Sequence, residues 1–385
     1  MRIGVNTLFL VPGDVGGTET YLRRILSHMT SALGGDTLVL FTTLENDKLL
    51  RSDLENFSGV EFHQLGFRAA NRPLRILLEQ FWLPLIVKKC NVQVLWSPGY
   101  IAPAVCPCPQ AVTVHDLQYK KYPEDINIAE RATLALLVKV ACRVCRSVLT
   151  ISEFSRQEII RYGLAPAERI TAIYSGVSRE FAKQEEEKTT GTNLDTIIAG
   201  HPYILCVSHT YPHKNIHMLI DAFGLVHREI PHSLLLVGKG RRGEEQVQKS
   251  LAGLEGTCKD RVQRLSNLDF GQLKALYQNA DLFVFPSGYE GFGLPVLEAM
   301  MAGTSVVTTR EASLPEVGGP HVTYADQISP EAFAETIMRV VGRPAREKRK
   351  REEAAKKWAV SFSWDVTAST ILGVLRQIAD DTDIH

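Results

Sequence analysis

Short runs of β-branched and aromatic residues alternate with longer helical patterns along nearly the whole chain. This alternation is typical of parallel sheets that are covered by helices on both faces. In the first half of the chain the expected strands are Ile3–Thr7, Thr37–Thr42, Val92–Trp96, Ala111–Val114 and Val148–Ile151, and the expected helices lie near Glu19–Met29, Pro73–Lys89, Ala129–Cys145 and Glu153–Tyr162. In the second half the expected strands are Tyr203–Val207, Ser233–Val237, Val262–Leu265, Leu282–Phe285 and Ser305–Thr308. The pattern predicts the α/β class, with doubly wound, Rossmann-like sheets.

The length of the chain predicts two such domains. It has 385 residues, which is more than twice a typical domain of about 150 residues. We expect an N-terminal domain at 1–183, a linker at 184–201, a second domain at 202–362, and a C-terminal helix and tail at 363–385. The linker is predicted from the polar, aperiodic segment Glu185 to Asn193, and the last helix from apolar residues at helical spacing between Trp364 and Ile378.

Charge and cysteine content restrict the partners and the compartment. Forty-three basic residues balance 43 acidic ones, so the chain has no long-range attraction for polyanions, and we expect no nucleic-acid partner. The first residues lack the basic region and cleavage site of a signal peptide, and we interpret them as a strand. Seven cysteines, an odd number, favour reduced thiols. We therefore expect a cytoplasmic protein.

In doubly wound domains ligands bind beyond the carboxyl ends of the strands, so the loops there are the candidate functional segments. The loop from Pro12 to Thr20 contains Gly16 and Gly17 directly before a helix. These glycines allow backbone N–H groups to approach an anion, and the helix start adds partial positive charge. Phosphate is the natural ligand, although ordinary helix initiation explains the same residues.

Two further loops carry basic residues at strand ends. His115 follows the strand that ends at Val114, where it can hydrogen-bond a sugar hydroxyl or serve only as a structural residue. The segment from His209 to Asn215 brings His209, His213 and Lys214 to the start of a helix. Such a group would neutralise a diphosphate, while a capped turn with exposed basic residues is the alternative.

The loop from Pro286 to Gly303 is the most informative segment. Glu290 lies in a glycine-rich turn, and Glu298 lies farther along the helix that follows it. The backbone amides of Phe292, Gly293 and Leu294 are expected to point at whatever lies before the helix. Spacing alone does not identify the ligand, because two solvated glutamates would produce the same pattern.

Taken together, these segments resemble the retaining glycosyltransferases of family four. The resemblance extends over essentially the entire chain and is carried by Gly16-Gly17-Thr18-Glu19, His115-Asp116, Ile151 to Ile159, Leu236-Val-Gly-Lys-Gly240, Tyr289 to Met300 and Ser313-Leu-Pro-Glu-Val317. It implies the GT-B fold, in which two Rossmann-like domains face each other and a C-terminal helix packs back on the N-terminal domain. It also implies transfer of a hexose from a nucleotide-diphosphate sugar with retention of anomeric configuration and without a metal ion.

The resemblance implies roles for individual residues. The sugar hydroxyls would be held by Glu290 and the amides of Phe292, Gly293 and Leu294, and the ribose by Glu298. The diphosphate would be bound by Lys214, His209 and the Gly16–Gly17 loop, and the base by the backbone at Leu265. Gly238 would belong to the same donor-binding site. His115 would face the reactive side of the sugar, which makes His115, Lys214 and Glu290 the candidate catalytic residues. Many relatives carry arginine where His209 or His213 stands, so these histidines are a departure from the family pattern.

The sequence does not identify the acceptor or decide whether the protein contacts a membrane. The resemblance implies a glycan or lipid-linked acceptor on the N-terminal domain, with polysaccharide biosynthesis as the setting. Phe81 and Trp82 lie in an apolar helical pattern among basic residues, which fits either peripheral contact with the inner face of the cytoplasmic membrane or ordinary core packing. The donor is expected to be GDP-mannose, with UDP-glucose and UDP-N-acetylglucosamine as alternatives. A sugar-nucleotide epimerase or hydrolase of the same fold, or a non-catalytic scaffold that binds nucleotide sugars, would share these features.

Overall fold

The computed structural model describes residues 1–14, 16–182 and 202–381. These residues form two compact units. The first unit contains Met1–Gly176 and Ser363–His385, and the second contains Val177–Phe362. The predicted N-terminal domain extends past this boundary to residue 183, and the predicted linker at 184–201 lies outside the described residues.

The first unit is built on a seven-stranded sheet with the order β3-β2-β1-β4-β5-β6-β7. Every pair of neighbouring strands is parallel. The strands are β1 (Arg2–Asn6), β2 (Thr37–Thr42), β3 (Val60–Gln64), β4 (Val94–Ser97), β5 (Gln110–Thr113), β6 (Ser147–Thr150) and β7 (Ile170–Ala172). The strand order reverses between β1 and β4, which is where ligands of doubly wound sheets bind.

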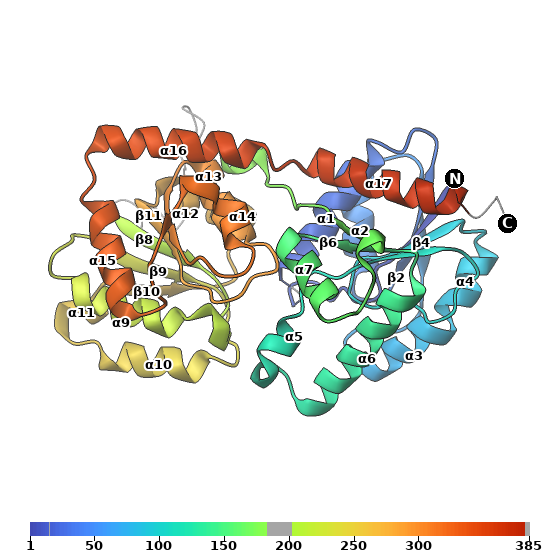
Figure 1. Cartoon of the computed structure of the whole chain (residues 1–385), viewed down its shortest axis with the longest axis horizontal. Coiled ribbons are helices and arrows are strands. Elements are labelled where there is room, and N and C mark those ends of the chain that lie inside the picture. Colours follow the sequence, from blue (N-terminus) through green and yellow to red (C-terminus); the bar gives the residue numbers. More distant parts are fainter. Residues whose placement is uncertain (15, 183–201, 382–385) are drawn as a thin grey trace. The chain divides into compact units, whose positions relative to one another are not determined.

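Helices cover both faces of this sheet (Figure 1). They are α1 (Gly17–Thr30), α2 (Asp47–Leu54), α3 (Arg72–Phe81), α4 (Leu83–Lys89), α5 (Gln118–Lys121), α6 (Ile128–Val144), α7 (Glu153–Arg161) and α17 (Trp364–Asp380), with short 3₁₀ turns at Pro123–Asp125 and Ala167–Arg169. One face packs against α4 and α6 through Leu83, Val87, Val138 and Ala141. On the other face α1 packs against α17.

The C-terminal helix α17 belongs to the first unit, as predicted. Ile371, Leu372 and Leu375 are completely buried, and Arg376 Nε donates to Asp36 Oδ2 at 2.8 Å. Within the described part of the chain, Ala345–Asp380 is the stretch long and apolar enough to be tested as a membrane span, with a mean hydropathy of 1.2 in its most apolar window. Most of the large apolar side chains of α17 are buried in the core, although Val366 is exposed, so packing accounts for much of that value.

The second unit contains a six-stranded parallel sheet with the order β10-β9-β8-β11-β12-β13. Its strands are β8 (Tyr203–Val207), β9 (Ser233–Val237), β10 (Val262–Leu265), β11 (Leu282–Phe285), β12 (Ser305–Thr308) and β13 (Thr323–Tyr324). Its helices are α9 (Ile216–Val226), α10 (Glu244–Gly253), α11 (Gly256–Asp260), α12 (Phe270–Asn279), α13 (Leu294–Ala302), α14 (Leu314–Gly318), α15 (Pro330–Val341) and α16 (Ala345–Val360), with 3₁₀ turns at Arg179–Phe181, Pro212–Lys214 and Gly319–His321.

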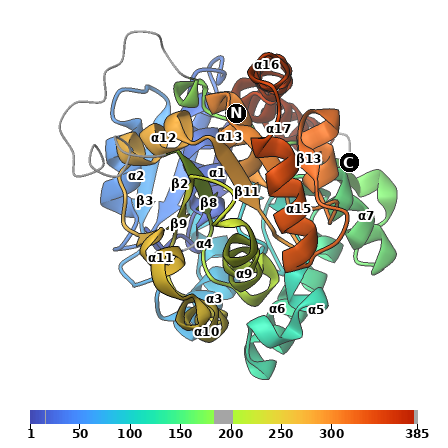
Figure 2. The same ribbon diagram turned by 90° about the vertical axis from the view of Figure 1, so that its left-hand side faces the viewer.

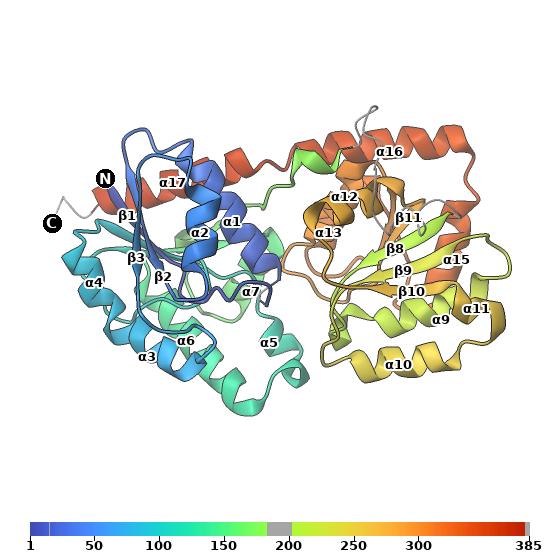
Figure 3. The same ribbon diagram turned by 180° about the vertical axis from the view of Figure 1, so that it is seen from behind.

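The main core of the second unit lies between the sheet and helices α9, α10 and α15. It contains completely buried side chains such as Leu219 and Phe223 of α9 and Phe333 of α15. Helices α12, α13 and α16 pack together on the opposite face, and Figures 2 and 3 show the two layers. The carboxyl ends of β8 and β11, the two central strands, therefore meet at one edge between these layers.

The sequence predictions were wrong at a few elements of the fold. The single helix expected at Pro73–Lys89 is two helices, and Trp82 ends α3 and precedes α4. Pro84 accounts for the break, because its ring cannot donate a backbone hydrogen bond and collides with the preceding helical turn. The strands β3, β7 and β13 were not predicted, since they are short or polar strands at or near the sheet edges.

Candidate active site

In the second unit an ion pair joins the loops that follow β8 and β11. Lys214 Nζ lies 2.5 Å from Glu290 Oε1, and the two side chains are 17% and 11% exposed. Two more contacts hold the same loops together: Gly288 N donates to His213 O at 2.8 Å, and Asn215 Nδ2 donates to Pro286 O at 3.1 Å. The fold thus brings two predicted catalytic residues, 76 positions apart in sequence, into direct contact.

The Glu290 loop is held by Ser313, the residue that immediately precedes α14. Ser313 Oγ, which is completely buried, lies 2.9 Å from Glu290 O and 2.8 Å from Phe292 O. Its single proton is shared between two carbonyls, so the loop backbone is fastened on both sides of Gly291. The role of Ser313 was not predicted, although the residue begins one of the motifs that carried the resemblance.

The glycine-rich turn leads directly into α13. Gly293 has φ 108°, and a Cβ atom there would lie 2.8 Å from Leu314 Cδ2, so the turn requires glycine. No side chain caps the start of α13. Pro295 has no N–H group and Val296 N donates to Gly293 O at 3.0 Å, so the amide that the first turn offers to a ligand is that of Leu294. The helix start also carries partial positive charge that a bound anion or hydroxyl can use.

Glu298 lies in α13 and accepts a hydrogen bond from Tyr277 Oη of α12 at 2.8 Å. Burial and the neighbouring Glu298 carboxylate raise the pKa of Tyr277 well above its usual range, so the phenol keeps its proton and acts as a donor. Tyr277 thus orients the carboxylate predicted to bind the ribose. No sequence signal marked this partner.

The predicted base-binding segment lies at the ends of β9 and β10. Gly238 N donates to Leu265 O at 2.9 Å, and a Cβ atom on Gly238 would lie 2.0 Å from Ser208 O, so the backbones approach too closely for any other residue. Nearby, Arg264 donates to both carboxylate oxygens of Glu244, from Nη1 to Oε1 at 2.5 Å and from Nη2 to Oε2 at 3.0 Å. This contact, together with hydrogen bonds from Gln248 and Thr210, lowers the pKa of Glu244 to about 2, although partial burial acts in the opposite direction.

His209 is held as a hydrogen-bond acceptor. Its Nδ1 accepts from Lys239 N at 3.0 Å, so that nitrogen carries no proton. An imidazole in this state is neutral and offers a phosphate no fixed charge. This hydrogen bond therefore gives a physical reason to expect that His209 binds a diphosphate less strongly than an arginine at this position would.

In the first unit His115 follows β5 and is 4% exposed. Its Nε2 donates to Pro98 O at 2.8 Å, and burial lowers its pKa to about 4 despite that hydrogen bond. The imidazole is therefore neutral near pH 7, with its proton on Nε2. It can accept a hydrogen bond through Nδ1, but it cannot supply a positive charge.

Gly16 and Gly17 begin α1. Gly16 has φ 57° and is the N-cap residue, and no side chain caps the helix. A Cβ atom added to Gly17 would meet nothing within 4 Å, so protein packing does not require glycine there. Val15 in the same loop lies outside the described residues.

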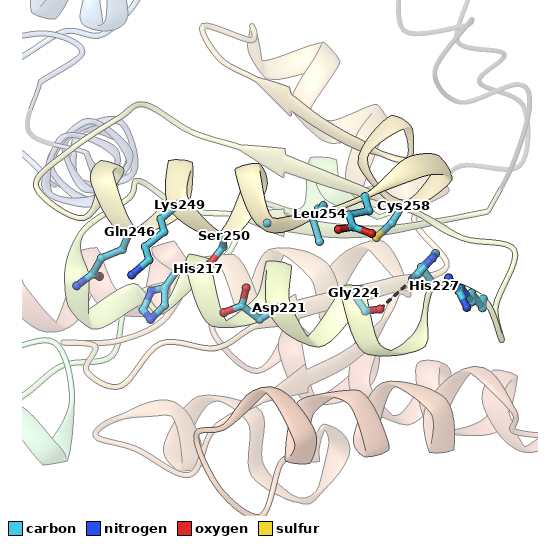
Figure 4. Close-up of a pocket in the computed structure, with 12 residues that line it drawn as sticks. His217, Asp221, Gly224, His227, Gln246, Lys249, Ser250, Leu254 and Cys258 are labelled. Atoms are coloured by element: carbon cyan, nitrogen blue, oxygen red, sulfur yellow. Dashed lines mark hydrogen bonds between the residues drawn. The ribbon is translucent and has the colours of Figure 1, made fainter.

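A groove of about 750 Å³ lies elsewhere in the second unit, between α9 and α10 (Figure 4). His217 and Asp221 line it from α9, and Lys249 and Ser250 from α10. None of the predicted donor-binding residues lines this groove. The candidate site is therefore identified by the chemistry of the residues at the carboxyl ends of the strands and not by the size of a surface groove.

Comparisons with known proteins agree with this geometry. Residues 15–181 match the family model Glycosyltransferase Family 4, and residues 195–358 match Glycosyl transferases group 1, which together cover most of the chain. The chain belongs to the group 1 glycosyltransferases of family four.

Two curated relatives are similar in sequence to part of this glycosyltransferase. It is 29% identical over 243 residues to the O-antigen chain mannosyltransferase RfbU of Salmonella typhimurium, covering 62% of each chain. It is 35% identical over 192 residues to the O-antigen chain mannosyltransferase B of Escherichia coli, covering 50% of each. The matched region thus spans less than two thirds of either relative.

Two solved structures confirm the fold. HepE of Anabaena, solved with UDP and glucose, superposes with a TM-score of 0.75 at 21% identity, covering 98% of this chain and 100% of that one. WaaG, a glycosyltransferase involved in lipopolysaccharide biosynthesis, gives 0.71 at 15% identity, covering 97% and 99%. The expected two-domain GT-B fold is confirmed.

Replacing Lys214 tests the site of this glycosyltransferase. We expect Lys214→Ala to lower kcat/KM by about 10²- to 10³-fold, the usual effect of removing one charge-stabilising group from an active site. The control is Lys348→Ala, which removes an ion pair with Asp281 of the same unit. Steady-state kinetics of both variants are the measurement, and an equal loss in the two would contradict a specific role for Lys214.

Proposed function

We propose that the protein is a retaining mannosyltransferase that needs no metal ion. It transfers mannose from GDP-mannose to a glycan or lipid-linked acceptor in polysaccharide biosynthesis. The observation that carries the proposal is the contact between Lys214 and Glu290 next to the uncapped start of α13. One carboxylate for sugar hydroxyls and one cation for phosphate are held together where a sugar diphosphate would need both.

The charges of the reaction account for these residue types. As the bond between the anomeric carbon and the phosphate oxygen breaks, negative charge grows on the diphosphate and positive charge on the sugar. Lys214 and the positive end of the α13 helix dipole stabilise the leaving diphosphate. The acceptor hydroxyl attacks the same face of the sugar, forms the new glycosidic bond and loses its proton to the leaving phosphate oxygen.

The neutral state of His115 suits this scheme. A protonated histidine beside a sugar that develops positive charge would destabilise the transition state, whereas an imidazole with a pKa of about 4 carries no such charge near pH 7. Its Nδ1 remains able to accept a hydrogen bond from a sugar hydroxyl. We assign His115 this role at the reactive side of the sugar.

Metal independence follows the same reasoning. Lys214 and the start of α13 supply the positive charge that a divalent cation would otherwise provide. Among residues 1–14, 16–182 and 202–381, no group of three or more His, Cys, Asp or Glu side chains is arranged to hold a metal ion. The choice of GDP-mannose is supported by the mannosyltransferases among the relatives.

Nucleotide binding tests the donor directly. With EDTA present, GDP and GDP-mannose are expected to raise the melting temperature, while UDP and ADP and their sugar conjugates are not. A ligand at 100 times its Kd stabilises the folded state by about 2.7 kcal/mol. A shift with uridine nucleotides alone, or a shift that requires a divalent ion, would contradict the proposal.

We also propose that the first unit attaches to the inner face of the cytoplasmic membrane. Its helices carry apolar side chains that are partly or mostly exposed: Leu74, Leu77 and Phe81 of α3, Leu85 of α4, and Ile128 and Leu136 of α6, each between 39% and 79% exposed. We call these six residues the apolar face. Arg72 at the start of α3 pairs with Glu130 in the first turn of α6 at 3.2 Å, which links the two helices.

Basic residues accompany the apolar face. Arg68, Lys88, Lys89, Lys139 and Arg143 are exposed. A surface that combines exposed apolar residues with lysine and arginine binds anionic bilayers through both burial and charge. Attachment there would bring the enzyme to a lipid-linked acceptor.

Vesicle binding tests the attachment. Phe81→Ser with Leu85→Ser should weaken binding to vesicles of phosphatidylglycerol and phosphatidylethanolamine by more than tenfold, because each large apolar side chain contributes about 1.5–3 kcal/mol when buried. The control is Leu225→Ser, since Leu225 is 54% exposed in the second unit. If the wild-type protein does not cosediment with these vesicles, or if the control loses binding equally, the assignment of the apolar face is wrong.

A further inference from the structure

Tyr100 has a backbone conformation that is rare for an aromatic residue. Its φ is 71°, in the left-handed region that favours glycine. The residue lies in the segment between β4 and β5, just beyond the carboxyl end of β4. This is the side of the sheet, next to the reversal of strand order at β1 and β4, where a doubly wound domain binds its ligand.

The surroundings of Tyr100 hold the strained conformation in place. Tyr100 N donates to Thr113 O at 3.0 Å. The preceding Gly99 packs so closely that a Cβ atom there would lie 2.2 Å from Phe9 Cδ1. After the turn, the Gln80 side chain donates to Ala102 O at 3.1 Å and accepts from Ala104 N at 2.9 Å.

The ring of Tyr100 is adjacent to His115. The two ring centroids are 5.2 Å apart and the planes are inclined by 49°. Tyr21 contacts the same imidazole edge-on at 4.8 Å. Tyr21 is only 2% exposed, whereas Tyr100 is half-buried and keeps part of its surface open. Of these two tyrosines, Tyr100 is therefore the one that a ligand can reach.

A glycine would adopt the same turn without strain, so the turn alone gives no reason for an aromatic side chain. Part of the Tyr100 side chain packs against the core that contains Val112 and Val114, and the rest of it is exposed. Strained residues that their surroundings hold rigidly are concentrated at ligand sites. An aromatic ring offers a flat apolar surface, which matches the C–H face of a pyranose and is held here with little loss of conformational freedom on binding.

We propose that Tyr100 is the platform on which the acceptor sugar packs, beside His115. The proposal rests on the proposed function, because it takes the first unit as the acceptor-binding unit. The ligand class is the non-reducing end of a glycan, held through the apolar face of a pyranose ring. Tyr100 is then a binding residue that selects and orients the acceptor.

The test compares Tyr100→Gly with Tyr100→Phe. Transfer from GDP-mannose to para-nitrophenyl α-mannoside should show an acceptor KM raised by about tenfold in Tyr100→Gly, since an aromatic contact of this kind is worth roughly one decade in affinity. Tyr100→Phe should change the acceptor KM by less than about threefold, because the ring is kept. Binding of GDP should be unchanged in both variants.

Folding is controlled within the same experiment. Glycine relieves the backbone strain at position 100 but removes a ring that packs against the core, so Tyr100→Gly is expected to melt earlier than the wild type, and its kinetics are measured well below its melting temperature. Asn91→Gly makes the same backbone change at φ 52°, before β4 and at the opposite end of that strand, and should leave the acceptor KM unaltered. An unchanged acceptor KM in Tyr100→Gly, or a loss of GDP binding in that variant, would overturn the proposal.

Acceptor binding without turnover separates this proposal from the proposed function. Saturation-transfer NMR of α-mannobiose with the wild-type protein and GDP is expected to show binding, and Tyr100→Gly is expected to lose most of it. This result stands even if GDP-mannose proves to be the wrong donor. Equal saturation transfer to both proteins, or none to the wild type, would overturn the assignment of Tyr100.

Discussion

The candidate active site of the second unit depends on the contact between Lys214 and Glu290. This ion pair fastens the loop after β8 to the loop after β11, with Nζ and Oε1 2.5 Å apart. Both side chains are less than one-fifth exposed, so each would be costly without the other, by about 3–5 kcal/mol when one partner of a buried pair is removed. Ser313 then fastens the carbonyls around Glu290, and the glycine turn carries the same chain into α13. An incoming sugar diphosphate meets a site whose charges are already balanced.

The two units use burial in different ways. In the second unit a largely buried ion pair keeps fixed charges at the proposed diphosphate site. In the first unit burial removes charge, because it lowers the pKa of His115 to about 4 and leaves a neutral imidazole. The proposed division of labour follows from this difference: one unit holds the charged donor, and the other presents neutral hydrogen-bonding and aromatic groups to a sugar.

Much of the fold could be predicted from the sequence, because buried parallel strands are continuous apolar runs. The predicted bounds of β2, β8, β9, β11 and β12 agree with the structure for that reason, and those of β10 agree as well although this strand is more polar and less buried. The candidate residues Lys214, Glu290 and Glu298 could also be named, since they lie in loops or helix starts with a distinct local pattern. Their partners could not. Ser313 lies 23 residues after Glu290, Tyr277 lies 21 before Glu298, and each contact exists only in the folded chain. The strain at Tyr100 is equally invisible in a sequence, because tyrosine carries no signal for positive φ.

The anomeric configuration of the product tests the central claim most directly. We would incubate the protein with GDP-mannose, a mannoside acceptor and EDTA, and determine the new linkage by NMR. GDP-mannose has the α configuration, so front-face attack at the site around Lys214 and Glu290 predicts an α-linked product. A β-linked product would contradict the retaining mechanism, and release of free mannose without any transfer would contradict the transferase itself.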